Sequence, residues 1–245
     1  MLQSIFTIDE NVKIAKDVMK MTLIGDTSHI TKSGQFVNIK IDGLFLRRPI
    51  SVCDVEGNIL TLIYKIVGEG TEKMANMPEG TKLDILTGLG NGYDLSLSGD
   101  KPLLVGGGVG VPPMYYLCRL LVKEGKKPSV ILGFNSKDDV FYEEEFKKLC
   151  SDVRVATADG SYGIKGFVTD ALEAIDYTHF YSCGPEPMLK ALSDKTITSG
   201  QLSFEERMGC GFGACMGCSC KTITGYKRIC KEGPVMRKEE ILWES

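Results

Sequence analysis

The sequence predicts an antiparallel β-barrel, then an α/β domain built on a parallel sheet, and finally a small cysteine-rich domain. Short strand patterns separated by glycine-containing turns fill roughly the first hundred residues, without a long helical period. From about residue 100 strand and helix patterns alternate, which is typical of a parallel sheet covered on both faces. Five of the nine cysteines lie in the last 36 residues. We therefore expect domains at 1–99, 100–204 and 205–245.

Size and composition exclude several classes of protein. With 245 residues, 43% apolar and 25% charged, the chain is typical of a globular protein long enough for two domains. Its net charge of −3 favours neither nucleic acid nor an anionic membrane as a partner. No uncharged apolar stretch approaches the roughly 18–20 residues that span a bilayer, and the N-terminus lacks the pattern of a signal peptide. Cysteines that look like thiolate ligands favour a reducing, cytoplasmic location.

In the first domain, alternation of apolar and polar residues predicts the strands of a closed barrel. These strands are expected at 12–15, 18–23, 36–41, 59–66 and 82–86, with one short helix at 71–77.

Two segments of the barrel carry residues that suit a phosphate-bearing ligand. Arg47-Arg48-Pro49-Ile50-Ser51 stands at the head of a strand, and the planar fork of an arginine fits a diphosphate. The alternative is that both arginines are solvated charges beside a turn. Gly68-Glu69-Gly70-Thr71 precedes the short helix, where backbone N–H groups favour an anion. A plain turn with Thr71 as the N-cap would have the same sequence.

The second domain reads as four β-α units. We expect strands at 102–105, 129–132, 153–156 and 179–181, and helices at 114–124, 139–149, 167–175 and 186–192.

Three loops follow strands of this sheet and would meet at its carboxyl edge, where such sheets bind ligands. The stretch from Gly106 to Pro113 offers N–H groups for a pyrophosphate, although Pro113 replaces the third glycine of the usual dinucleotide fingerprint. Asp159-Gly160-Ser161 and the loop beginning Ser182-Cys183-Gly184-Pro185 follow two other strands. Each loop alone is compatible with an ordinary turn, but together on one edge they favour a dinucleotide.

The most specific motif is the cysteine run near the C-terminus. Cys210, Cys215, Cys218 and Cys230 are separated by four, two and eleven residues, which is the plant-type ferredoxin spacing for a [2Fe–2S] cluster. Interspersed glycines permit tight turns and close approach of backbone N–H groups to sulfur. Structural zinc is the alternative, but zinc ribbons usually carry two short-spaced cysteine pairs. The spacing is complete without Cys220, which we therefore expect not to be a ligand.

Taken in order, the barrel, Arg-Pro-Ile-Ser, Gly-x-Gly-Thr, the glycine-rich loop and Cys-Gly-Pro resemble the ferredoxin–NADP⁺ reductase superfamily of flavoproteins. With the C-terminal cysteine run and Cys230-Lys-Glu-Gly-Pro234, the whole chain resembles the electron-transfer subunits of class 1B dihydroorotate dehydrogenases.

This resemblance implies three cofactor sites. FAD would lie in the barrel cleft against Arg48, Pro49, Ile50, Ser51, Ile63, Tyr64, Lys65, Gly70 and Thr71. Arg48 would bind its pyrophosphate, and Ser51 would lie near the reactive edge of the flavin. The dinucleotide would lie across Gly107, Gly108 and Gly110, with Cys183 and Gly184 near its nicotinamide. Cys210, Cys215, Cys218 and Cys230 would hold the cluster. The family favours NAD over NADP, although Lys137 stands where a 2′-phosphate contact could be sought.

The resemblance also implies the function, an oxidoreductase subunit of pyrimidine biosynthesis. A separate FMN-containing catalytic subunit would oxidise dihydroorotate, and this chain would pass the electrons through [2Fe–2S] and FAD to NAD⁺. We expect no dihydroorotate site on this chain and a heterotetramer with two copies of each subunit. The alternatives are a reductase subunit serving ferredoxin or another redox partner, and a non-catalytic nucleotide-sensing protein with structural zinc.

Overall fold

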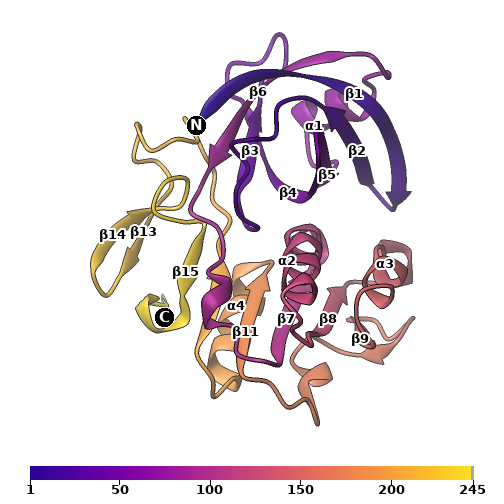
Figure 1. Cartoon of the computed structure of the whole chain (residues 1–245), viewed down its shortest axis with the longest axis vertical. Helices are drawn as coiled ribbons and strands as arrows, with labels where there is room; N and C mark the ends of the chain where they lie inside the picture. Colours follow the sequence, from indigo (N-terminus) through magenta and orange to yellow (C-terminus); the bar gives the residue numbers. More distant parts are fainter. Residues whose placement is uncertain (244–245) are drawn as a thin grey trace.

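A computed structural model of the chain describes residues 1–243. The barrel and the α/β domain lie one above the other, and the C-terminal segment runs along one side and contacts both (Figure 1). The predicted fold class, an antiparallel barrel followed by a parallel sheet and a cysteine-rich segment, is confirmed. No helix within residues 1–243 is long and apolar enough to cross a membrane.

The barrel closes in the strand order β1-β2-β5-β4-β3-β6. Its strands are β1 (Leu2–Ala15), β2 (Val18–Ile24), β3 (Phe36–Ile39), β4 (Arg48–Glu56), β5 (Ile59–Lys65) and β6 (Lys82–Leu89). Helix α1 (Glu69–Ala75) follows β5 and begins two residues earlier than the sequence predicts. Apolar residues at alternate positions, such as Met21 and Leu23 on β2, point inward and form the barrel core.

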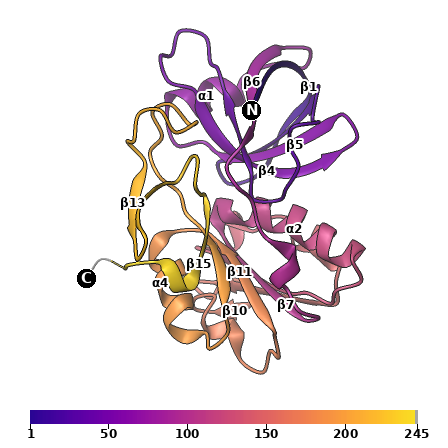
Figure 2. The ribbon, with the colours of Figure 1, turned by 60° about the vertical axis from the view of Figure 1, so that its left-hand side comes forward.

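The second sheet has the order β10-β9-β8-β7-β11-β12-β15. Its strands are β7 (Pro102–Gly107), β8 (Ser129–Phe134), β9 (Asp152–Thr157), β10 (Ile164–Lys165), β11 (His179–Cys183), β12 (Gly200–Ser203) and β15 (Val235–Arg237). The first six are parallel, whereas β15 pairs antiparallel with β12. Strand β15 belongs to the C-terminal segment, which therefore completes the sheet of the preceding domain (Figure 2).

Both faces of this sheet are covered. Leu104 of β7 packs with helix α2 (Val111–Lys123) and with barrel residues such as Ile63. Leu103, on the opposite face, packs with Leu189 and Leu192 of helix α4 (Glu186–Lys195). The alternation along β7 thus separates a face that supports the barrel from a face that supports α4.

The predicted helix at 167–175 is wrong. Only the 3₁₀ turn η4 (Asp170–Leu172) forms there, and Ala174 has a left-handed φ of 58°. Arg154 of β9 donates hydrogen bonds through Nη1 to the carbonyl oxygens of Ala171 and Glu173, at 3.0 and 2.6 Å. Because these carbonyls bond to a distant arginine, they are not available to an α-helical ladder.

The predicted helix at 139–149 is also largely absent. The 3₁₀ turn η3 (Lys137–Asp139) comes first, Val140 is extended, and Tyr142 has a left-handed φ of 64°. Helix α3 therefore spans only Glu143–Lys147. Val140, Phe141 and Tyr142 pack against the same core as α2, and this burial takes precedence over the helical pattern.

Five strands are absent from the sequence prediction: β10, β12, β15 and the hairpin formed by β13 (Ser219–Thr222) and β14 (Gly225–Arg228). They are two to four residues long, too short to show alternation. The remaining 3₁₀ turns are η1 (Leu95–Leu97), η2 (Gly108–Gly110) and η5 (Lys238–Glu240).

Candidate functional site

A cavity of about 460 Å³ opens at the carboxyl ends of β7, β8, β9 and β11. Strands β8 and β9 lie on one side of β7, and β11 lies on its other side. The cavity therefore lies at the point where the strand order reverses. Dinucleotides bind at this point in sheets of this kind. Gly107 and Gly108 line the cavity, together with Asp139, Phe167 and Met188.

The other three residues expected at the dinucleotide form the junction between two loops. A Cβ added at Gly110 would lie 2.2 Å from the Cys183 carbonyl oxygen, so only glycine allows these segments to touch. A Cβ at Gly184 would lie 2.5 Å from Met188 Cε. Cys183 is 1% exposed, and burial, followed by the charge of Glu205, raises the pKa of its thiol. The thiol is therefore protonated at neutral pH and suits packing rather than nucleophilic chemistry.

A second cavity of about 460 Å³ lies between the barrel and the C-terminal segment. It is lined by all nine residues expected at the flavin: Arg48, Pro49, Ile50, Ser51, Ile63, Tyr64, Lys65, Gly70 and Thr71. Strand β4 supplies the first four, the end of β5 the next three, and α1 the last two.

Gly70 provides the space in which the Arg48 side chain lies. A Cβ at Gly70 would lie 2.0 Å from Arg48 Nε, so even alanine would displace the guanidinium. Arg48 Nη1 donates to the Leu46 carbonyl oxygen, which holds the side chain at the cavity wall. This cradle at a helix start is of the right charge and shape for a diphosphate, and the residues present therefore fit a flavin dinucleotide.

Arg47 and Thr71, which lie near the flavin cavity, form contacts that hold the surrounding strands and loop in place. Arg47 forms an ion pair with Asp84 at 3.0 Å and donates to the Asp84 carbonyl oxygen at 2.9 Å, joining β4 to β6. The Thr71 hydroxyl accepts from the backbone N–H of Val67 at 2.9 Å and donates to the Gly68 carbonyl oxygen at 2.9 Å. Thr71 thus orders the loop between β5 and α1. The alternative that Arg47 is a solvated charge beside a turn is wrong, because its guanidinium is paired with Asp84.

The two cavities adjoin. Lys65 at the end of β5 and Val109 in η2 line both of them. A ring in the dinucleotide cavity and a ring in the barrel cavity can therefore approach each other across these two side chains.

Sequence reasoning missed a third wall of the flavin cavity. It comes from the C-terminal segment and consists of Phe204, Glu205, Glu206, Met208 and Pro234. Packing around the Glu205 carboxyl raises its pKa. The only sequence signal for this wall is that its residues flank the cysteine run, because they follow no periodic pattern.

The β13–β14 hairpin brings two of the predicted ligands together. Cys218 immediately precedes β13 and Cys230 follows β14 by one residue, so the strand pairing sets them side by side. The Cys230 N–H donates to Cys218 Sγ at 3.4 Å. Both side chains are 2% exposed. Burial, followed by the hydrogen bond between the Cys230 thiol and the Cys218 side chain, raises the pKa of the Cys230 thiol to about 12.

The other two ligands lie on a turn that rests on the barrel. The Ala214 N–H donates to Cys210 Sγ at 3.2 Å, and Cys210 also interacts with the Cys215 thiol. Although burial opposes ionisation, backbone N–H groups of this turn lower the pKa of the Cys210 thiol to about 6. Gly211, with φ of 78°, allows the turn to approach Asn38 of β3, since a Cβ there would lie 2.3 Å from Asn38 Nδ2.

The four cysteines thus form two pairs, Cys210 with Cys215 and Cys218 with Cys230. Two cysteine pairs match the four thiolates that hold a [2Fe–2S] cluster. Cys220 lies outside both pairs and donates to Met236 Sδ at 3.8 Å.

Comparison with known proteins gives two family matches. Residues 205–242 match the iron–sulfur cluster binding domain of dihydroorotate dehydrogenase B, and residues 104–194 match the oxidoreductase NAD-binding domain. The electron transfer subunit of dihydroorotate dehydrogenase B (NAD⁺) from Fusobacterium nucleatum is 49% identical, over 96% of each chain. The chain belongs to this family. The electron transfer subunit from Shouchella clausii is 44% identical over 98% of each chain.

A solved structure of an NADH-dependent reduced ferredoxin-NADP oxidoreductase, a flavin-based electron-bifurcating enzyme, also resembles this electron transfer subunit. A chain of that structure is 30% identical with a TM-score of 0.87, covering 97% of this chain and 90% of that one. The match spans the barrel, the sheet and the cysteine segment, so all three parts occur together in both proteins.

Proposed function

We propose that this chain carries electrons from a dihydroorotate-oxidising catalytic subunit to NAD⁺, using one [2Fe–2S] cluster and one FAD. The observation that carries the proposal is the adjacency of three sites. The dinucleotide cavity shares Lys65 and Val109 with the flavin cavity, and Met208 of the flavin cavity packs with Cys210, Cys218 and Cys230. Together they make a continuous route through the chain.

Each cofactor has a site of suitable chemistry. The Arg48–Gly70 cradle would hold the FAD diphosphate, Gly107 and Gly108 would approach the NAD pyrophosphate, and the two cysteine pairs would hold the cluster. A bound flavin exchanges two electrons with nicotinamide and single electrons with an iron–sulfur cluster. Val109 lines both cavities and the buried Cys183 lines the flavin cavity, so both lie where the two rings would meet.

NAD rather than NADP fits the first cavity. Asp139 lines it, with one carboxylate oxygen accepting from Ser136 N and Oγ at 3.1 and 2.9 Å. A carboxylate suits a ribose 2′-hydroxyl and repels a 2′-phosphate. Lys137 is the residue at which a 2′-phosphate contact could be sought. It is exposed, and its backbone N–H donates to Ser161 Oγ.

The partner subunit would dock on the solvent-exposed part of the turn that carries Cys210 and Cys215. Cys215 is exposed, and beside it Phe212 and Met216 are 44% and 53% exposed. Exposed apolar side chains next to a redox centre favour contact with another protein. We propose an FMN-containing catalytic subunit at this face and a heterotetramer with two copies of each subunit. Nine cysteines outside disulfides, four of them proposed cluster ligands, suit a reducing cytoplasm.

The test is the activity of the complex. The chain is co-expressed with the FMN subunit, purified anaerobically, and assayed for FAD, iron, acid-labile sulfide and reduction of NAD⁺ by dihydroorotate. We expect flavin, two irons and two sulfides per chain and steady NADH formation, which a Cys215→Ser complex loses. A fully loaded complex that reduces ferredoxin but not NAD⁺ would refute the proposal in favour of the reductase function that the similarity to the bifurcating enzyme suggests.

A further inference from the structure

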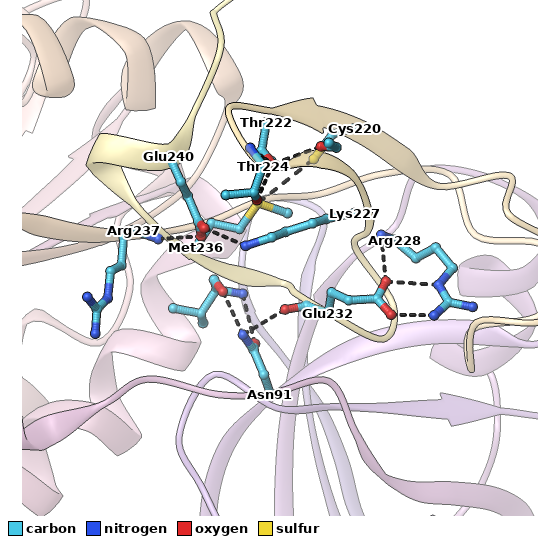
Figure 3. A network of polar contacts seen from close by, with 12 residues as sticks. Asn91, Cys220, Thr222, Thr224, Lys227, Arg228, Glu232, Met236, Arg237 and Glu240 are labelled. Atoms are coloured by element: carbon cyan, nitrogen blue, oxygen red, sulfur yellow. Dashed lines mark hydrogen bonds and ion pairs between the residues drawn. The ribbon is translucent and has the colours of Figure 1, made fainter.

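A network of polar contacts in the C-terminal segment includes Arg228, Glu232 and Asn91 (Figure 3). Arg228 ends β14 two residues before Cys230, and Glu232 lies two residues after it. Arg228 N and Nε both donate to Glu232 Oε2 at 2.8 Å, and Arg228 Nη2 forms an ion pair with Glu232 Oε1. The two side chains therefore meet fork to fork, the strongest geometry for this pair.

The same guanidinium reaches the other cysteine pair. Arg228 Nη1 donates at 2.6 Å to the carbonyl oxygen of Gly213, which lies between Cys210 and Cys215. Gly213 has a φ of 92°, and a Cβ there would lie 2.6 Å from Lys231 Cδ. Arg228 thus joins the turn that carries one cysteine pair to the hairpin that carries the other.

The Glu232 side of the network is tied to the barrel. Asn91, which follows β6, donates through Nδ2 to the Glu232 carbonyl oxygen at 2.9 Å. The Asn91 N–H also donates to the Gly233 carbonyl oxygen at 2.8 Å. Motion of the ion pair relative to the barrel is therefore restricted.

We propose that Arg228 and Glu232 form a clamp that holds the two cysteine pairs in register and sets the reduction potential of the cluster bound between them. This inference rests on the proposed cluster site. Arg228 places a positive charge two residues from Cys230 and, through Gly213, against the turn that carries Cys210 and Cys215. Glu232 balances this charge. Nearby positive charge favours the reduced, more negative cluster, and nearby negative charge opposes it.

The test uses two single substitutions with opposite electrostatic consequences. Arg228→Gln leaves Glu232 as an unpaired anion, so we expect a lower reduction potential than in the natural protein. Glu232→Gln leaves an unpaired cation, so we expect a higher one. Both break the clamp and should speed iron release to a chelator, on the order of 10- to 100-fold. A merely structural role would not move the potential in opposite directions.

Arg228→Lys separates the two parts of the role. Lysine keeps the charge but loses the planar fork, so we expect a potential close to that of the natural protein together with faster iron release. If Arg228→Gln fails to retain the cluster, the potentials of Glu232→Gln and Arg228→Lys carry the test.

Lys227→Gln and Glu240→Gln are matched controls. Lys227 and Glu240 form an ion pair in the same domain, but it joins β14 to η5 instead of the cysteine turn (Figure 3). All variants are made in the full chain, and potentials are read by redox titration with electron paramagnetic resonance. Shifts no larger than those of the controls, or of the same sign in Arg228→Gln and Glu232→Gln, would overturn the clamp.

Iron and sulfide analysis of the natural chain separates this inference from the proposed function. A chain without iron and sulfide would refute the cluster site itself. A chain with an intact cluster whose potential ignores both substitutions would refute only the clamp.

Discussion

Arg48 and Gly70 work as a pair, because the absence of a Cβ at one makes room for the guanidinium of the other. The Gly70 Cβ position lies 2.0 Å from Arg48 Nε. We therefore expect Gly70→Ala to weaken FAD binding as Arg48→Ala does, by about 1.5–3 kcal/mol for a lost charge-assisted hydrogen bond. The double variant should be scarcely worse than either single one, as measured by FAD titration of the apoprotein.

Glu72→Ala is the control for this prediction. Glu72 lies on the same helix, but its side chain is exposed and lies outside the residues that line the flavin cavity. FAD affinity unchanged in Gly70→Ala, or additive losses in the double variant, would contradict the cradle.

The cysteines of the C-terminal segment also differ in their expected roles, because Cys215 is a proposed cluster ligand and Cys220 is not. The Cys215 thiol interacts with Cys210, a second proposed ligand, whereas Cys220 donates to Met236 Sδ. We expect Cys215→Ser to abolish the visible absorption and iron content of the cluster and Cys220→Ser to retain both. The reverse result would show that the ligand set includes Cys220.

At the scale of elements, strand β11 carries a buried titratable group. His179 is 4% exposed, with Gln201 Nε2 of the neighbouring β12 at 3.3 Å from its Nε2. Burial lowers the His179 pKa, while the charges of Glu239 and Asp94 oppose this. The folded protein therefore holds the imidazole neutral at a pH where the unfolded chain, with a pKa near 6.5, already binds a proton.

The consequence is a loss of stability on the acidic side. As pH falls below about 6.5 the unfolded state gains protons that the folded state does not bind, so the free energy of unfolding decreases. We expect the melting temperature of the natural chain to drop by a few degrees more than that of His179→Gln between about pH 7.5 and pH 5.5. Parallel pH profiles in thermal melts would contradict this.

The elements also show why local patterns fail where they do. The sequence pattern at 167–175 predicts a helix, but Arg154 of β9 donates hydrogen bonds to two carbonyl oxygens of this segment. The pattern at 139–149 is interrupted because Phe141 is needed in the core beneath α2. Both corrections depend on contacts with residues that lie outside the segment itself.

For the whole molecule, Asn91 connects the barrel to the cysteine segment. Its Nδ2 donates to the carbonyl oxygens of Glu232 and Val235 at 2.9 and 2.7 Å, and its Oδ1 accepts from Val235 N at 3.1 Å. We expect Asn91→Ala to destabilise the attachment of β15 by about 1–3 kcal/mol. Faster amide hydrogen exchange in β15 and the cysteine hairpin, with β1 and β2 unchanged, is the measurement. Unaltered exchange there would show that the attachment depends on apolar packing.

The sequence alone determined the classes of structure and the chemistry of the sites. Strand alternation and β-α alternation are local periodicities, so the barrel and the parallel sheet were predictable. The spacing of Cys210, Cys215, Cys218 and Cys230 identified four thiolates, because a short loop must present them together. Only the tertiary structure decided how the sites meet: that Lys65 and Val109 border two cavities, that β15 completes a sheet begun 133 residues earlier at β7, and that Arg228 spans both cysteine pairs. These relations join residues that are distant along the chain, and no local pattern encodes such contacts.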